Sequence, residues 1–170
     1  RSGPIGSRFT EPRGVAVVKI KTLEVDGFGV WSGLELADLS DEVTVFYGAN
    51  EAGKTTLMQF VRTMFFGFSA DRRARYLPPL HTSAAGKPAL TGGSLQAIDG
   101  GVPWTLTRRA EGPIATGSLQ IVDSKEQRHD DILFRLLSDI DEPIFSNVFA
   151  LGMREMQQLA TLNDTEAARQ

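Results

Sequence analysis

Residues 48–55 read GANEAGKT and fit the pattern G-x-x-x-x-G-K-[ST]. In this pattern the loop curls so that backbone N–H groups point inward and bind phosphate. We expect Gly48 and Gly53 to permit the curl, because glycine tolerates positive φ. Lys54 would reach the β- and γ-phosphates of a nucleoside triphosphate as a point charge, and the Thr55 hydroxyl would hold Mg²⁺. The pattern therefore predicts a phosphate-binding loop with Lys54 as its catalytic residue.

A loop of this kind must be held between a strand and a helix. Residues 42–47, EVTVFY, are β-branched and aromatic and predict a short buried strand. Residues 54–66 contain no Gly or Pro and are apolar on most sides, which predicts a buried helix that ends at Gly67. The start of this helix would point unpaired N–H groups and its positive dipole end at the phosphates. The alternative is a glycine-rich turn that caps an ordinary helix.

Two sets of residues follow from this arrangement. The expected core face of the helix consists of Leu57, Phe60, Val61, Met64 and Phe65. We expect Thr56 and the amides of Ala52 and Gly53 to donate further hydrogen bonds to phosphate.

The stretch GANEAGKTTLMQFVRTMFFG resembles the G-x-N-E-x-G-K-[ST]-T-L form of the SMC, RecF, RecN and SbcC ATPases, which are ABC-type heads that work on DNA. Asn50 and Glu51 carry this resemblance. The stretch KIKTLEVDGFGVWSG at 19–33 looks like the opening strand and turn of such heads, and FSNVFALGMREMQQL at 145–159 is similar to the YhaN-like bacterial branch. By resemblance, the nucleotide-binding set comprises Gly48, Asn50, Glu51, Ala52, Gly53, Lys54, Thr55 and Thr56.

The resemblance implies an α/β fold, the N-terminal lobe of an ABC-type P-loop ATPase head. Its mixed sheet would carry an antiparallel layer around a central P-loop helix, followed by a helical C-terminal part. The lobe would span 15–162, after a flexible leader at 1–14 and before a helix at 163–170 that leads to a coiled-coil arm. The implied cofactors are ATP and Mg²⁺. The implied partners are the protein's own C-terminal lobe, a second head and, as a possibility, DNA, in DNA repair or chromosome maintenance.

Two features of complete ABC-type heads are missing after Thr55. We find no apolar strand that ends in Asp-Glu and no LSxGQ-type stretch. The first would supply a second Mg²⁺ ligand and the carboxylate that positions water. By resemblance, the second caps the γ-phosphate of the partner. The chain is therefore expected to bind ATP weakly and to hydrolyse almost none.

The γ-phosphate-sensing loop of the family would lie near residues 152–157, and here the sequence departs from the pattern. Met153 aligns with the sensing glutamine, while Glu155, Gln157 and Gln158 lie just beyond it. Glu155 and Gln157 become the candidate metal ligands.

The rest of the chain predicts short strands. Residues 15–24 and 31–37 would pair around the turn at 26–29, and 93–99, 102–109 and 117–122 would form a β-meander. Residues 69–93 are expected to be an irregular loop, and 130–140 an amphipathic helix. Phe28 and Trp31 are either neighbours of the nucleotide base or core aromatics.

Five arginines form two candidate basic patches. They are Arg72, Arg73 and Arg75 in the irregular loop and Arg108 and Arg109 at the end of a strand. Each patch could contact a phosphate backbone or belong to a solvated loop or surface ion pairs. His81 and His129 are isolated, which argues against a metal site at either.

Composition sets the outer limits. The chain has 170 residues, a net charge of −3 and no cysteine. A wholly basic nucleic-acid-coating protein is unfavoured, disulfides are excluded, and a cytoplasmic location is expected. No apolar run approaches the roughly 18 residues that span a bilayer. The alternatives are a non-hydrolysing interaction module and a small GTPase or kinase, the latter disfavoured because no N-K-x-D motif is present.

Overall fold

The computed structural model describes residues 18–77, 90–111, 115–129 and 131–150. Its centre is a five-stranded sheet with the order β2-β1-β3-β4-β5, in which every neighbouring pair is antiparallel. The strands are β1 (Lys19–Gly27), β2 (Leu34–Leu36), β3 (Gly92–Asp99), β4 (Val102–Arg109) and β5 (Ser118–Asp123).

Alternation of side chains gives the sheet one buried face. Leu23 and Val25 of β1, Leu95 of β3 and Leu106 of β4 are each at most 2% exposed. The residues between them along each strand are more polar and point the other way, as the two-residue period of a strand requires. The β3–β4 turn consists of Gly100 and Gly101, both at positive φ, which suits a tight two-residue hairpin.

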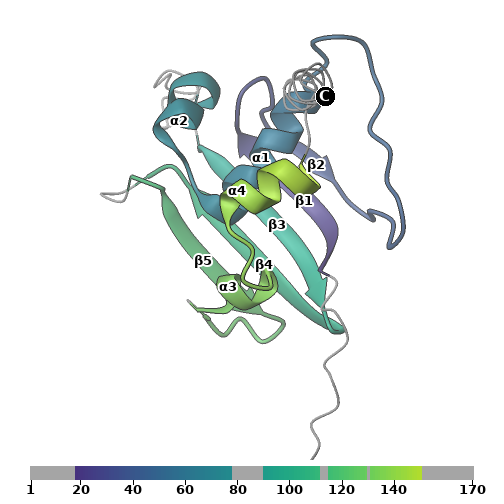
Figure 1. Cartoon of the computed structure of the whole chain (residues 1–170), viewed down its shortest axis with the longest axis vertical. Coiled ribbons are helices and arrows are strands. Elements are labelled where there is room, and N and C mark those ends of the chain that lie inside the picture. Colours follow the sequence, from purple (N-terminus) through teal and green to yellow (C-terminus); the bar gives the residue numbers. More distant parts are fainter. Residues whose placement is uncertain (1–17, 78–89, 112–114, 130, 151–170) are drawn as a thin grey trace, which may run out of the picture.

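Helix α1 (Lys54–Phe66) lies over the buried face, and α4 (Glu142–Ile144) lies over the same face (Figure 1). Phe60 and Met64 of α1 are fully buried in the shared core. The helix ends at Gly67, whose φ is 86° and whose N–H donates to the Thr63 carbonyl at 2.8 Å. The other helical segments are α2 (Ala70–Tyr76), α3 (Ile132–Leu136) and a π-helical turn, Phe145–Phe149, that continues α4.

Several expectations are confirmed. Helix α1 has the predicted bounds, and four of its five predicted core residues are buried, with Val61 half-buried. The β1–β2 hairpin and the β3–β4–β5 meander also form as expected. The α/β class therefore holds, with an antiparallel layer against the central helix.

The predicted strand at 42–47 is wrong. These residues form no strand, and Val43, Val45 and Tyr47 are 76%, 75% and 94% exposed. Figure 1 shows the segment as part of a long connection that stands away from the sheet. A buried strand needs neighbours on both sides, and no strand of the described residues pairs with this one. The expectation of a mixed sheet is also wrong, because every described strand pairing is antiparallel.

Two further expectations need correction. Residues 70–76 are helical rather than irregular, because the Ser69 hydroxyl accepts from the Arg72 N–H and caps α2. The helix expected at 130–140 is only Ile132–Leu136, since Ser138 and Asp139 adopt positive φ and end it. The predicted leader at 1–14 and the helix at 163–170 lie outside the described residues.

None of the described helices is both long and apolar enough to cross a membrane.

Candidate functional site

The loop before α1 curls through two residues at positive φ. Gly53 has a φ of 86° and Glu51 a φ of 67°, while Gly48 is not in this region, so the expected role of Gly48 in the curl is wrong. Gly48 is instead a point of close approach, because a Cβ there would lie 3.3 Å from the Cβ of Ala52. The Ala52 N–H donates to the Ala49 carbonyl at 3.2 Å and tightens the loop.

Lys54 folds back over this loop. Its Nζ donates to the carbonyls of Gly48 and Ala49, both at 2.7 Å, and the side chain is exposed. An ammonium group has three N–H donors. Two of them bond to the loop carbonyls, so the exposed cation lies across the mouth of the loop.

Among the described residues, no hydrogen-bond acceptor is found for the first amides of α1. Gly53 is the N-cap, no side chain caps the helix, and no acidic residue lies in the first turn. The first four N–H groups of any helix lack intrahelical acceptors, and the dipole makes this end positive. Thr55 is exposed beside these amides. The donors and the cation together form an arrangement that suits an anion, and the Thr55 hydroxyl oxygen suits Mg²⁺.

Phe28 and Trp31, the two candidate neighbours of the nucleotide base, lie in different environments. Phe28 is 0% exposed, stacks on Tyr76 at 5.0 Å between ring centroids and meets Phe60 edge-on at 5.6 Å, so it cannot contact a nucleotide base. Trp31 is half-buried, and its Nε1 donates to the Gly53 carbonyl at 3.3 Å, which places its indole against the loop.

Two apolar cavities lie between Phe46, in the exposed 42–47 segment, and the body of the domain. One, of about 270 Å³, lies beside the loop. The other, of about 310 Å³, lies between α1 and the π-helical turn Phe145–Phe149. Phe46, Lys54 and Leu57 line both cavities. The exposed segment therefore leaves apolar space beneath it.

Arg108 is part of the fold rather than of a basic patch. Its side chain is buried and donates to the Met64 carbonyl at 3.1 Å and to the carbonyls of Phe65 and Thr116 at 3.4 Å. Burial lowers the pKa of Arg108 to about 10, so it remains charged at neutral pH. The prediction that Arg108 contacts DNA is wrong, because its donors are committed to buried carbonyls.

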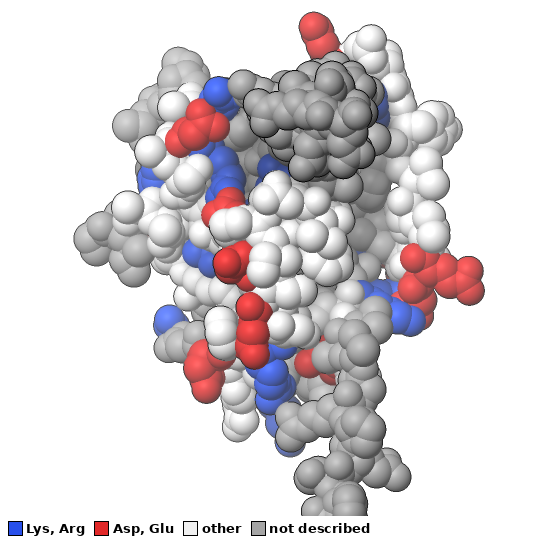
Figure 2. Space-filling view, viewed as in Figure 1, with Lys and Arg blue, Asp and Glu red and all other residues white. Residues whose placement is uncertain are grey.

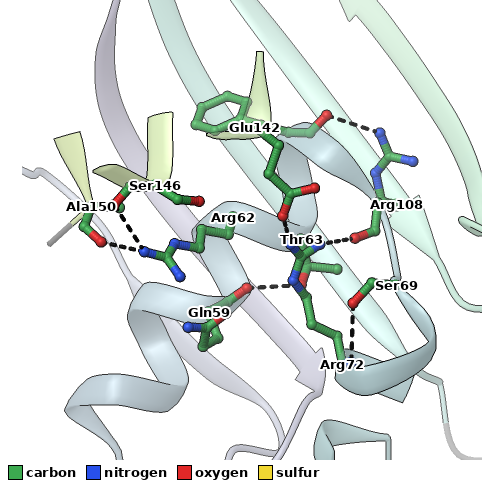
Figure 3. Close-up of polar contacts among 11 residues, drawn as sticks. Gln59, Arg62, Thr63, Ser69, Arg72, Arg108, Glu142, Ser146 and Ala150 are labelled. Carbon is green, nitrogen blue, oxygen red and sulfur yellow. Dashed lines mark hydrogen bonds and ion pairs between the residues drawn. The ribbon is translucent and has the colours of Figure 1, made fainter. Parts of the chain in front are cut away.

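Arg72 is similarly enclosed. It donates to the Gly67 carbonyl at 2.5 Å and forms an ion pair with Glu142, which joins α2 to α4 (Figure 3). Burial, followed by repulsion from Arg62, lowers the pKa of Arg72. The prediction that Arg72 contacts DNA is also wrong.

The other three arginines are less enclosed. Arg73 donates to the carbonyls of Ala115 at 2.6 Å and Ala110 at 3.2 Å, and Arg109 pairs with Asp26. Arg75 pairs with Asp71 one helical turn away at 2.8 Å and remains 61% exposed. The face in Figure 2 shows acidic and basic side chains interspersed rather than gathered into one basic patch.

Arg62 is a buried structural arginine that the sequence analysis did not identify. It is the one charged residue of α1 after Lys54, and only 6% of it is exposed. Its guanidinium donates to the Ala150 carbonyl and, at 3.5 Å, to the Ser146 carbonyl (Figure 3). A lone charge in an apolar helix was the available signal. The contact links α1 to the backbone of residues 146–150.

Of the remaining candidate ligands, the structure describes only His129. Met153, Glu155 and Gln157 lie outside the described residues, as does His81. His129 contacts Asp123 at 3.2 Å and Trp104 edge-on. Within the described ranges, no group of three His, Cys, Asp or Glu side chains could hold a metal ion.

Comparison with known proteins identifies a family whose model covers the loop. Residues 18–161 match the family model described as "AAA domain". The chain is also similar to the uncharacterised protein YhaN of Bacillus subtilis (strain 168), with 25% identity over 149 residues. The match covers 88% of this chain and only 14% of that protein. The chain therefore belongs to the AAA-domain family, as an ATPase-type nucleotide-binding domain of the YhaN type.

Proposed function

We propose that this domain is the ATP-binding N-terminal lobe of an ATPase head of the SMC, SbcC and YhaN kind. The observation that carries the proposal is the uncapped start of α1, where Lys54 lies across the curled loop and no acidic side chain occupies the first turn. A polyphosphate would replace the two loop carbonyls as the partner of Lys54 and would accept from the first amides of the helix.

Mg²⁺ fits the same place. The Thr55 hydroxyl is exposed beside the loop and would hold the ion, with Gln157 or Glu155 as further ligands. When bound, the ion would supply positive charge that offsets the negative charge of the phosphates. The residues of this chain would bind and orient the phosphate tail and hold Lys54 near it.

The rest of the head is the proposed partner of residues 43–47. The segment is β-branched and aromatic yet exposed, and the two apolar cavities lie beneath it. The match covers only 14% of the relative. We propose that the remainder of such a protein supplies strands beside this segment. We expect those strands to carry the missing carboxylate, so that this chain alone turns over almost no ATP. ATP-driven engagement with a second head would follow from the same arrangement.

The proposal extends to DNA binding, in DNA repair or chromosome maintenance in the cytoplasm. Arg75 has the most exposed guanidinium of the five candidates, and Arg73 and Arg109 are already engaged. Any backbone contact would start from Arg75.

Isothermal titration calorimetry with MgATP tests the proposal. The wild-type chain should bind one nucleotide, and Lys54→Ala should weaken binding by about 10- to 100-fold, the worth of hydrogen bonds to a charged group. Lys125→Ala removes an exposed lysine from the turn after β5 and should leave the affinity unchanged. Absence of heat with the wild type, or equal affinity for Lys54→Ala, would contradict nucleotide binding and favour an interaction module whose docking surface is the exposed 43–47 segment.

A further inference from the structure

The turn between β1 and β2 lies directly against the phosphate-binding loop. It is closed by two backbone bonds, from the Phe28 N–H to the Trp31 carbonyl at 3.0 Å and from the Trp31 N–H to the Phe28 carbonyl at 3.1 Å. Gly29, at a φ of 59°, makes this tight reversal possible. The buried Phe28 ring anchors the turn in the core.

Trp31 contacts the last residue of the loop in two ways. Its Nε1 donates to the Gly53 carbonyl, which also accepts the first hydrogen bond of α1, from the Leu57 N–H at 2.9 Å. Its ring lies against the Gly53 Cα, because a Cβ at that position would come within 2.6 Å of the indole. Gly53 is therefore held by its carbonyl and by its Cα.

The same turn also contacts the two helices beside the loop. A Cβ on Gly29 would lie 2.5 Å from the Thr56 methyl group, in the first turn of α1. The Gly29 N–H donates to the Tyr76 carbonyl at 2.5 Å, at the end of α2. The turn is therefore fixed from the core side and from α2, and it can act as a rigid support.

Gly53 needs such a support. Glycine has the largest backbone freedom of any residue, and Gly53 sits in the left-handed region without a side chain to cap the helix it begins. If its peptide rotated, the N–H groups that follow would point in other directions. A site that is ordered before its ligand arrives avoids the entropic cost of ordering on binding.

We infer that Trp31 is a positioning residue for the phosphate-binding loop, whose indole fixes the Gly53 peptide and so aims the first amides of α1. The inference rests on the proposed function for its consequence, nucleotide affinity. Its structural part, the order of Gly53 in the ligand-free chain, does not depend on that function.

The ligand-free arm of the test measures hydrogen exchange at two amides of α1 and its cap. The Leu57 N–H bonds to the carbonyl that Trp31 contacts, and the Gly67 N–H bonds to the Thr63 carbonyl at the other end. Trp31→Phe keeps an aromatic ring and removes the donor. It should lower protection at Leu57 by about 3- to 10-fold, the worth of one hydrogen bond, and leave Gly67 unchanged. General destabilisation would lower both, and an equal change at both amides would overturn the inference.

The nucleotide arm uses calorimetry with MgATP on the same variants. Trp31→Phe should weaken binding by about 3- to 10-fold, and Trp31→Ala by more, while Trp104→Phe serves as the control and binds as the wild type. In the Trp104→Phe background Trp31 is the single tryptophan, so its emission should change on addition of MgATP. Wild-type affinity in Trp31→Phe would overturn the inference. If the wild type bound no MgATP, the proposed function would fail, and the exchange at Leu57 alone would decide the role of Trp31.

Discussion

The two ends of α1 are finished in opposite ways. At the C-terminal end, Gly67 caps the helix, and Arg108 and Arg72 donate to carbonyls at or just after the last turn. At the N-terminal end, no side chain caps the helix, no acidic residue lies in its first turn, and the cation of Lys54 lies across the loop. The described side chains satisfy the C-terminal end of the helix, and our proposal assigns the N-terminal end to a ligand.

Both ends of α1 have cationic side chains nearby, but a cation has opposite effects at the two ends of a helix. A cation near the C-terminus of a helix is stabilising, because that end carries partial negative charge. A cation at the N-terminus has the wrong sign for stability, yet it has the right sign to bind an anion together with the free amides. The arginines therefore stabilise the fold, and the proposed role of Lys54 is recognition of the ligand.

The largest effect is expected from Arg108→Met. The substitution leaves the carbonyls of Met64 and Phe65 buried without their donor, which should lower the free energy of unfolding by about 2–3 kcal/mol. Arg109→Met is the matched control, since its pair with Asp26 is partly exposed and worth about 1 kcal/mol or less. Urea unfolding measures both. Equal losses for the two variants would mean that the C-terminal end is not held as described.

A smaller effect is expected from Glu142→Gln. It removes the carboxylate that pairs with the nearly buried Arg72, and we expect a loss of about 1–2 kcal/mol, between the values for exposed and buried pairs. The double variant Arg72→Met with Glu142→Gln should lose less than the sum of the two single variants, because they share one interaction. Strict additivity in urea unfolding would show that the pair does not couple α2 to α4.

The smallest effect, and the one of opposite sign, is expected from Thr55→Asp. A carboxylate in the first turn of α1 complements the dipole and Lys54, and it should raise the free energy of unfolding by about 0.3–1 kcal/mol. The same charge should repel MgATP and weaken its binding. Thr55→Ser keeps the hydroxyl and should match the wild type in both measurements. A destabilised Thr55→Asp variant would show that this end is not an unsatisfied positive terminus.

Local patterns were sufficient to predict α1, the hairpin and the meander. The uninterrupted apolar run before Gly67 marks both the helix and its end, and the Gly100–Gly101 pair marks a turn between alternating strands. These features depend on neighbours in sequence, which is why they could be read from it. The lysine and threonine of the loop were found in the same way, although their binding roles remain predictions.

Features that depend on distant partners were not predictable. Residues 42–47 have strand composition, but burial requires neighbouring strands that the described residues do not supply. Arg72 and Arg108 have the composition of a basic patch, yet the fold turns both toward carbonyls at the end of α1. Charge on a sequence does not reveal which side of a helix or strand will face the core.

Amide chemical shifts during a titration with MgATP test the central claim most directly, because they report on both ends of α1 at once. We predict that the largest changes occur at Gly53, Thr55 and Thr56, and that the amides of Gly67 and Phe68 stay in place. Changes at Gly67 and Phe68 as large as those at the start of the helix, or no change at Thr55 and Thr56 at saturating MgATP, would contradict the claim that the uncapped end is the binding end.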